Sequence, residues 1–237
     1  MIDTAGGSVL HAGSVADNCL VRNEWLCPLY VTTRSSQILE ALQEHVTILV
    51  VTLVVSVVIA LPLGVLAHRT AWLRSLVLGA STVVYTIPSL AMFSLLLPIT
   101  GFGLQTVVVA LVLYSLTVLV RGLVSGLDAV PGDAVDAATG MGYGRWRLLR
   151  EVQLPLALPT AFAGLRIAAV STVALTTIGF LFDSGGLGNL IYSGLTSNFR
   201  PEVLIPSIMC VALALLVDAL LVLLRRQLTP WRRGVAA

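Results

Sequence analysis

Lysine is absent from this sequence, and all 14 basic residues are arginine. A phosphate-binding P-loop requires a lysine after its glycines to reach the terminal phosphates, so the chain cannot hydrolyse ATP by that mechanism. Charged residues of any kind are scarce, at 11% of the chain, whereas a water-soluble domain has about a quarter. Because 57% of the residues are hydrophobic, they are too many for one buried core, and much of the surface must face lipid.

Signals for cleavable export and for metal binding are also missing. The first 30 residues hold no basic region followed by a continuous apolar run, so we expect no cleavable signal peptide. The histidines are isolated and the cysteines lack metal-site spacing, so we expect neither a metal site nor a catalytic site. These residues are His11, His45, His68, Cys19, Cys27 and Cys210. Cys19 and Cys27 are either unpaired or joined in a disulfide, the latter if their segment faces the oxidising side.

Long uncharged stretches define about five membrane spans. Residues 46–66 contain no charge and form about 21 residues or roughly 31 Å of helix, which matches a bilayer core. Residues 75–120 are also uncharged, and the group of Pro98, Gly101 and Gly103 within them indicates two spans joined by a tight turn. The predicted spans are 46–66, 75–97, 104–123, 159–182 and 203–224. The sequence therefore predicts an all-α, polytopic membrane protein.

The placement of arginine orients these spans. Ten arginines fall on one side if the spans alternate, and cationic loops stay in the cytoplasm. They are Arg69, Arg74, Arg121, Arg145, Arg147, Arg150, Arg225, Arg226, Arg232 and Arg233, whereas Arg22, Arg34 and Arg200 fall outside. The predicted parts are an external segment (1–45), a transmembrane domain (46–224) with a cytoplasmic loop at 124–158, and a basic cytoplasmic tail (225–237). The N-terminus is then outside and the C-terminus inside.

The segment ahead of the first span, SSQILEALQEHV, has the pattern of a short amphipathic helix. Ser35 or Ser36 is a candidate N-cap, and Ile38, Leu39 and Leu42 fall on one stripe. We expect this helix to lie on the outer membrane surface. The residues before it are polar and show no periodicity, so we expect them to be loosely ordered.

The cytoplasmic loop at 124–158 differs in composition from the rest of the chain. Asp133 is a candidate N-cap for a short helix through residues 136–138, whose flat alanine face permits close approach by another protein. A second amphipathic stretch, RWRLLREV, leads to Leu154 and Pro155, which we expect to redirect the chain into the fourth span. The glycines expected to end the short helix are Gly140, Gly142 and Gly144.

This loop resembles the EAA motif of ABC importer permeases, a Glu-Ala-Ala triplet with a glycine four residues later and then Ile-x-Leu-Pro. The matching residues are Asp136, Ala137, Ala138, Gly142, Val152, Gln153, Leu154 and Pro155. Asp replaces Glu and Val replaces Ile, which are mild departures. The resemblance implies a coupling helix that docks in a groove of a separate ATPase, and the alternative is an amphipathic connector without that role.

The resemblance covers nearly all of the chain from the first span onward and implies a type I ABC importer permease fold in a bacterial plasma (inner) membrane. It implies a cytoplasmic ABC ATPase dimer that binds the ATP, so the chain itself needs no cofactor. It further implies a second permease copy or a paralogue, and a separate extracytoplasmic substrate-binding protein. Membrane lipid surrounds the spans, and we expect no nucleic-acid partner.

Three stretches resemble the osmoprotectant-uptake permeases: YTIPSLAMFSLLLPITGFG (85–103), GLR (164–166) and GGLGNLIYSGL (185–195). They imply transport of a small quaternary amine such as glycine betaine, carnitine or choline. One alternative is an ABC permease for another small solute such as an amino acid. The other is an ion-gradient-driven secondary transporter, which usually has more spans and internal repeats.

The glycines Gly185, Gly186 and Gly188 follow an apolar span rather than a strand, which favours a turn over a nucleotide-binding loop. By the resemblance, this external loop and the short helix after it help to close the outer gate and contact the binding protein.

Two charges lie inside the predicted spans. Arg166 and Asp218 each stand about seven residues, or roughly 10 Å, from the cytoplasmic ends of their helices. A lone charge at that depth is costly, so we expect the two to pair directly or through one water, with Arg121 as a competing partner. The alternative is a direct role in the solute path.

Several polar-capable side chains lie near span centres, where helix-packing hydrogen bonds are the default explanation. Aromatic faces also attract quaternary ammonium groups, which makes the tyrosines candidates for lining the pathway. The candidate pathway residues are Tyr85, Pro88, Ser89, Tyr114 and Ser115.

Overall fold

The computed structural model describes residues 18–230, and within that range the chain consists of helices and their connections alone. His11, Arg232 and Arg233 lie outside the described residues. The elements in order are α2 (Pro28–Thr33), α3 (Ser35–Arg69), α4 (Ala71–Thr86), α5 (Ser89–Thr100), α6 (Leu104–Asp128), α7 (Gly132–Gly140), α8 (Arg145–Leu148), the π-helical turn η1 (Leu149–Gln153), α9 (Leu154–Thr176), the 3-10 helix η2 (Thr177–Phe182), α10 (Leu187–Thr196) and α11 (Arg200–Leu228).

Four helical stretches in the described chain are long and apolar enough to cross a membrane, and the bent pair α4 and α5 brings the number to five if it forms one span. The prediction of an all-α membrane protein with about five spans is confirmed. The helices extend past the predicted spans, because α6 continues to Asp128 and the helical stretch that contains the predicted span 159–182 begins at Arg145. The predicted loop at 124–158 is therefore largely helical at both ends.

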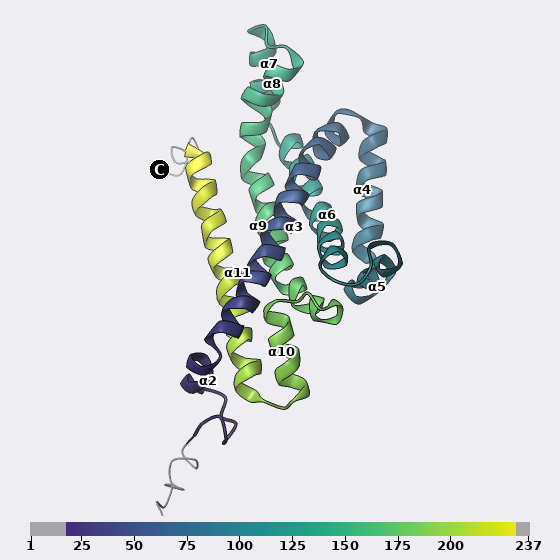
Figure 1. Cartoon of the computed structure of the whole chain (residues 1–237). Coiled ribbons are helices and arrows are strands. Elements are labelled where there is room, and N and C mark those ends of the chain that lie inside the picture. Colours follow the sequence, from purple (N-terminus) through teal and green to yellow (C-terminus); the bar gives the residue numbers. More distant parts are fainter. Residues whose placement is uncertain (1–17, 231–237) are drawn as a thin grey trace, which may run out of the picture.

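The predicted second span, 75–97, is wrong as a single helix. The axes of α4 and α5 differ by 105°, and Figure 1 shows α5 turned across the lower end of α4. Ile87 has extended backbone angles (φ −70°, ψ 125°), as residues before proline prefer. Pro88 then has no N–H with which to continue the helix.

The helix predicted on the outer membrane surface is also wrong, because its residues form the first turns of α3 and continue into the first span. Between Ser35 and Leu61 the sequence offers no glycine or proline that would end a helix. Arg34 occupies the N-cap position, and no side chain caps the helix there. The 35 residues of α3 extend about 52 Å, so its N-terminal turns project beyond a bilayer core.

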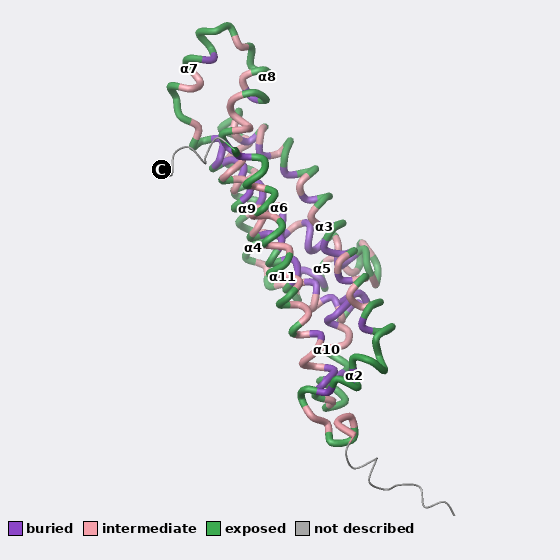
Figure 2. Tube along the Cα trace, turned by 90° about the vertical axis from the view of Figure 1, so that its left-hand side faces the viewer, coloured by how far each residue is buried: buried purple, intermediate pink, exposed green. Residues whose placement is uncertain are grey.

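The centre of the bundle is the contact between α6 and α9, where small residues allow close approach. A Cβ on Gly122 would lie 3.2 Å from the Cα of Gly164, and a Cβ on Gly126 would lie 2.7 Å from the carbonyl oxygen of Ala157. In lipid, helix association depends on such close packing rather than on expulsion of water. Figure 2 shows the buried residues concentrated along this middle region.

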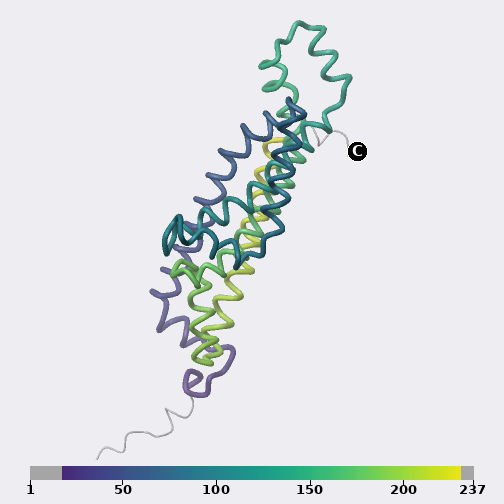
Figure 3. The backbone as a smooth tube through the Cα atoms, turned by 90° about the vertical axis from the view of Figure 1, so that its right-hand side faces the viewer, coloured from purple at the N-terminus to yellow at the C-terminus, as the bar shows by residue number. Residues whose placement is uncertain are grey.

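The two ends of the bundle differ in what they present. Figures 1 and 3 place α2 and α10 at one end, and α7, α8 and the last turns of α11 at the other. Near α2, Cys19 and Cys27 form a disulfide, and Cys27 packs with Tyr30 and Ile38. Of the two alternatives for these cysteines, the disulfide is the one found. The prediction of loose order is therefore wrong for residues 18–34, which the disulfide and the buried Tyr30 fix in place.

Candidate functional site

The predicted coupling helix is present as α7, which projects past the ends of the long helices (Figures 1 and 2). Asp133, Asp136 and Ala137 are exposed, whereas Ala138 is buried. Asp133 is not the N-cap as predicted, because Pro131 holds that position and no side chain caps the helix. Asp133 lies in the first turn instead, where a negative charge favours the helix N-terminus. The exposed side of α7 thus presents two carboxylates beside a small, flat alanine.

Gly142 ends α7 through a Schellman motif. Its φ is +82°, in the left-handed region. The N–H of Gly142 donates to the carbonyl of Thr139 (2.9 Å), and the N–H of Tyr143 donates to the carbonyl of Ala138 (3.1 Å). Both bonds form only when residue 142 has a positive φ, and glycine adopts that conformation without a steric penalty. This gives a physical reason for glycine at this place in the motif.

The chain returns from α7 through α8, which begins after Gly144. Arg147 stabilises this return in two ways. Its Nε donates to Glu151 (3.0 Å), and its guanidinium lies 4.2 Å from the centroid of the Tyr143 ring. The turn that closes α7 is therefore packed against the helix that follows it.

Val152, Leu154 and Pro155 lie where α8 passes into α9. The prediction that Leu154 and Pro155 redirect the chain is wrong, because the helical stretch continues from Arg145 to Phe182. The π-helical turn η1 ends at Gln153, immediately before the Leu-Pro pair. A wider turn accommodates a proline ring that would otherwise clash with the carbonyl four residues earlier. The Leu-Pro pair therefore coincides with a local widening of the helix and not with its end.

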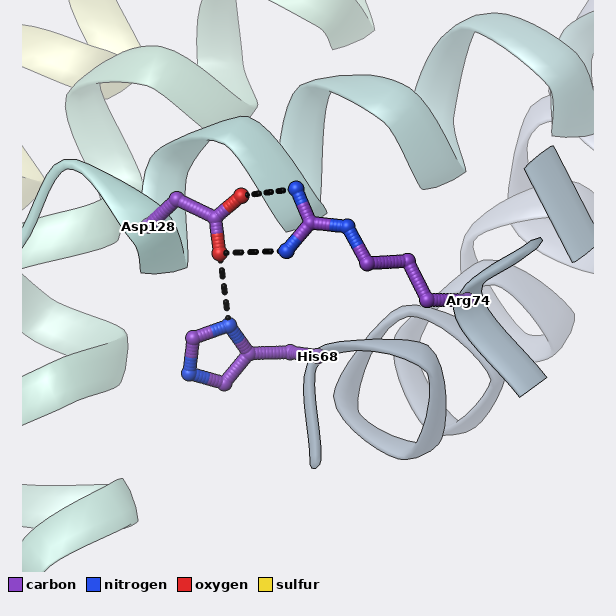
Figure 4. A network of polar contacts seen from close by, with 3 residues as sticks. All are labelled: His68, Arg74 and Asp128. Carbon is purple, nitrogen blue, oxygen red and sulfur yellow. Dashed lines mark hydrogen bonds and ion pairs between the residues drawn. The ribbon is translucent and has the colours of Figure 1, made fainter. Parts of the chain in front are cut away.

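At the base of the loop that carries α7, three helix ends are joined by one carboxylate (Figure 4). Asp128, the last residue of α6, accepts two hydrogen bonds from Arg74 of α4 (2.5 and 3.2 Å) and lies 2.9 Å from Nδ1 of His68 of α3. Sequence reasoning missed this network because it treated His68 as isolated. The available signal was that all three residues stand at the same predicted membrane face.

Tyr85 and Tyr114, both proposed for the pathway, meet at a cavity of about 280 Å³ between α4, α6 and α9. Their ring centroids are 6.3 Å apart in an edge-on arrangement. Tyr85 is 58% exposed, whereas Tyr114 is 8% exposed and donates its hydroxyl hydrogen to the carbonyl of Ile87 at the bend. No charged residue lines this cavity in the described chain.

The other predicted pathway residues divide into two groups. Ser115 lines the same cavity and shares a hydrogen bond with the hydroxyl of Thr172 (3.1 Å). Pro88 and Ser89 do not line it, because they form the bend between α4 and α5. The structure thus brings Tyr85, Tyr114 and Ser115 together at one cavity, whereas Pro88 and Ser89 form the bend between α4 and α5.

A second cavity, of about 490 Å³, adjoins the first and shares Tyr85 and Val118 with it. Arg121 lines it, donates to the hydroxyl of Thr82, and has no carboxylate among its neighbours in this cavity. Tyr114 and Arg121 are seven residues apart on α6, which places them on the same face, about 10 Å apart along the helix. Sequence reasoning assigned Arg121 only to orientation and possible charge pairing.

The predicted external-gate glycines are packed tightly between η2, α3 and the start of α10. A Cβ on Gly185 or Gly188 would lie 2.4 or 2.1 Å from backbone atoms of η2. Gly186 has a φ of +52°, and its Cβ would lie 2.7 Å from the backbone of His45. These glycines allow the connection after η2 to pack against η2 and α3.

The predicted pair of intramembrane charges is present. Arg166 of α9 donates to both carboxylate oxygens of Asp218 of α11, at 2.6 and 2.7 Å. Arg121 is not the partner of Asp218. Little of the apolar stretch of α11 is buried within the chain, so this bidentate pair is an important polar link between α11 and the bundle.

Comparison with known proteins finds similarity over most of the chain. Residues 56–234 match the family described as "Binding-protein-dependent transport system inner membrane component". The osmoprotectant import permease protein OsmW of Salmonella typhimurium is 36% identical over 192 residues, which cover 79% of this chain and 89% of that protein. The carnitine transport permease protein OpuCD of Listeria monocytogenes is 34% identical over 202 residues (85% and 91%). The choline transport system permease protein OpuBB of Bacillus subtilis is 31% identical over 202 residues (85% and 93%).

Solved structures share the fold. An inward-facing MetNI methionine ABC transporter matches with a TM-score of 0.77 and 23% identity, over 83% of this chain and 98% of that chain. An amino acid ABC transporter matches with a TM-score of 0.68 and 18% identity, over 85% and 99%. At these identities the likeness shows the fold alone.

Proposed function

Because the chain belongs to the family of binding-protein-dependent transport system inner membrane components, and is therefore the permease subunit of an ABC importer, we propose that it transports a small quaternary-ammonium osmoprotectant such as glycine betaine, carnitine or choline. Permeases of this family are multi-pass inner-membrane proteins that work with an ATPase and a substrate-binding protein, and they are not themselves enzymes. The predicted type I importer fold is confirmed, and the secondary-transporter alternative is excluded.

The observation that carries the choice of solute is the pair Tyr85 and Tyr114 at an uncharged cavity. A quaternary ammonium group has no N–H to donate, so an aromatic face suits it better than a hydrogen-bond acceptor does. The names of the similar permeases agree with such a solute, since they refer to osmoprotectants, carnitine and choline.

Glycine betaine and carnitine also carry a carboxylate, for which Arg121 is a suitable partner. Arg121 lies in the adjoining cavity and has no carboxylate neighbour there. Because Tyr114 and Arg121 are about 10 Å apart along α6, a small solute would contact the aromatic pair and the arginine in succession. Choline lacks the carboxylate and would gain nothing from Arg121.

Uptake into proteoliposomes that contain the ATPase and the binding protein tests this proposal. Tyr85→Leu should lower uptake of radiolabelled glycine betaine and choline by about 2- to 30-fold, the equivalent of roughly 0.5–2 kcal/mol of cation–π attraction. Tyr85→Phe keeps the aromatic face and is the matched control, which should retain uptake. Equal uptake by the two variants would contradict the role of the ring. Uptake of an amino acid in place of both amines would show that the solute class is wrong.

We further propose that α7 docks on a cytoplasmic ATPase dimer and that a second permease copy or paralogue completes the pathway. The exposed carboxylates and alanine of α7 support the first part, and the open cavity of about 490 Å³ that Arg121 lines between α4, α6 and α9 supports the second. ATP is then bound by the partner alone. The arginines of the described chain favour a cytoplasmic location for the α7 end.

Two variants test the docking and the orientation. Ala137→Arg places a bulky charge on the exposed face of α7 and should abolish solute-stimulated ATP hydrolysis while membrane insertion continues. Undiminished uptake by this variant would count against docking. For orientation, Gly144→Cys should resist an impermeant thiol reagent in intact cells and Ser184→Cys should react, and the reverse pattern would invert the proposed topology.

A further inference from the structure

A groove of about 590 Å³ lies between α3 and the continuous helix formed by α8, η1 and α9. Its walls are mainly aliphatic, and Leu61 and Leu66 on the α3 side are 47% and 50% exposed. Arg69 and Arg150 also line the groove, and none of its lining residues in the described chain is acidic. The groove thus combines an apolar wall with two positive charges.

Neither arginine is neutralised within the described residues. Arg69 lies 4.8 Å from the centroid of the Trp146 ring and donates one N–H to the carbonyl of Arg145 (3.3 Å), which holds it in place without cancelling its charge. Arg150 is exposed and makes no hydrogen bond or ion pair with any described residue. Its sequence neighbour Glu151 is already paired with another arginine.

The apolar part of the groove leads deeper into the membrane region. A second crevice, of about 270 Å³, shares Leu61 with the groove and is lined only by apolar side chains, including Val57 of α3 and Phe162 of α9. From Arg69 to Val57 the distance along α3 is about 18 Å. Trp146 is 68% exposed beside the arginines, as tryptophans at the headgroup level of a membrane commonly are.

We propose that this groove binds an anionic phospholipid such as phosphatidylglycerol, with its phosphate between Arg69 and Arg150 and one acyl chain along Leu61. Charge complementarity selects the headgroup, because a basic groove at the end of membrane helices favours anionic lipid. Free phosphate would match the arginines and leave the apolar wall unused. A zwitterionic lipid could pack its acyl chains against the apolar wall, but its headgroup ammonium would be repelled by the two arginines. The inference requires that α3 and α9 span the membrane, and it does not depend on the identity of the solute.

Brominated lipids test the proposal, with the assembled transporter in nanodiscs and tryptophan fluorescence as the readout. The contribution of Trp146 is isolated by comparison with Trp146→Phe. At equal mole fractions, brominated phosphatidylglycerol should quench Trp146 several-fold more strongly than brominated phosphatidylcholine. Arg150→Gln should raise the mole fraction of brominated phosphatidylglycerol needed for half-maximal quenching by about fivefold, and combination with Arg69→Gln should raise it roughly 25-fold, since each arginine contributes a similar attraction to anionic lipid.

Arg147→Gln is the matched control, because it removes the same charge from the same helix at a side chain outside the groove, and it should leave quenching unchanged. Arg150→Gln makes the proposal falsifiable without risk to folding, since this side chain has no partner in the described chain. Equal quenching by the two lipids, or no change on Arg150→Gln, would overturn the proposal. It would also be overturned if inorganic phosphate displaced the quenching lipid, or if no lipid quenched Trp146 because the ATPase covers the groove.

Discussion

Replacement of Gly142 by alanine tests whether the Schellman motif stabilises the end of α7, the helix proposed to dock on the ATPase. Nothing lies within 4 Å of a Cβ built at this position, so the effect comes from the backbone angle and not from a clash. An L-residue in the left-handed region costs about 1–2 kcal/mol. The closed turn should therefore become roughly 5- to 30-fold less favourable, because 1.4 kcal/mol corresponds to about tenfold in an equilibrium constant.

Gly140→Ala is the matched control. Gly140 is the last residue of α7, and a Cβ there also has open space. In a helix, alanine is favoured over glycine by about 0.5–1 kcal/mol, so this substitution should tighten the end of α7. The same chemical change, two residues apart, is thus expected to act in opposite directions.

Amide hydrogen exchange in the assembled transporter measures both effects. The N–H groups of residues 142 and 143 donate the two hydrogen bonds of the motif, and their exchange should accelerate about 5- to 30-fold in Gly142→Ala. In Gly140→Ala, exchange of the same amides should slow by about two- to fivefold. Solute-stimulated ATP hydrolysis should fall only in the first variant. Similar exchange rates in the two variants would refute the assignment of the motif.

Three further outcomes are expected. Arg166→Ala and Asp218→Ala should each lower folded yield or uptake, and the double variant should recover part of the loss, whereas strictly additive losses would show that the two residues are not coupled. Gly188→Ala should sharply lower the Tm of the purified protein, because the Cβ would lie 2.1 Å from a carbonyl oxygen, and a wild-type Tm would contradict this packing. Cys19 and Cys27 should react with a maleimide only after reduction, and labelling without reductant would disprove the disulfide.

Much of the candidate site could be predicted because it depends on local patterns. The short helix α7 follows from spacing within one loop, and Gly142 stands where a helix end needs positive φ. The pairing of Arg166 with Asp218 follows from depth, since two charges at one level of consecutive antiparallel helices have few other partners. Such inferences need only distances along one helix and the cost of an unpaired charge in lipid.

The breaks between helices were less predictable, because long-range contacts decide what a proline does. Pro155 lies within a continuous helical stretch, whereas Pro88 separates two helices by 105°. At the second site the carbonyl of Ile87 accepts a hydrogen bond from the hydroxyl of Tyr114, which is 27 residues away in sequence. That partner stabilises a bend inside the membrane region, where an unpaired carbonyl is costly, and no local pattern reveals it.

The α3 helix shows a second limit of sequence reasoning. Loss of hydrophobicity ahead of residue 46 marks the edge of the bilayer core, but it does not end the helix. The backbone hydrogen bonds of α3 continue into the aqueous region because no residue there interrupts them. Apolar runs therefore indicate where the spans lie, while the ends of the helices depend on capping residues and on glycine or proline.

The ion pair between α9 and α11 has a consequence for biosynthesis. Asp218 follows Arg166 by 52 residues, so at about 5–20 residues per second the ribosome makes the aspartate roughly 3–10 s after the arginine. During that interval α9 must enter the membrane with its charge unmatched, and the nascent chain depends on the translocon, on water or on lipid headgroups to shelter it. Completion of the last helix supplies the missing carboxylate, so the stable insertion of α9 is tied to the end of translation.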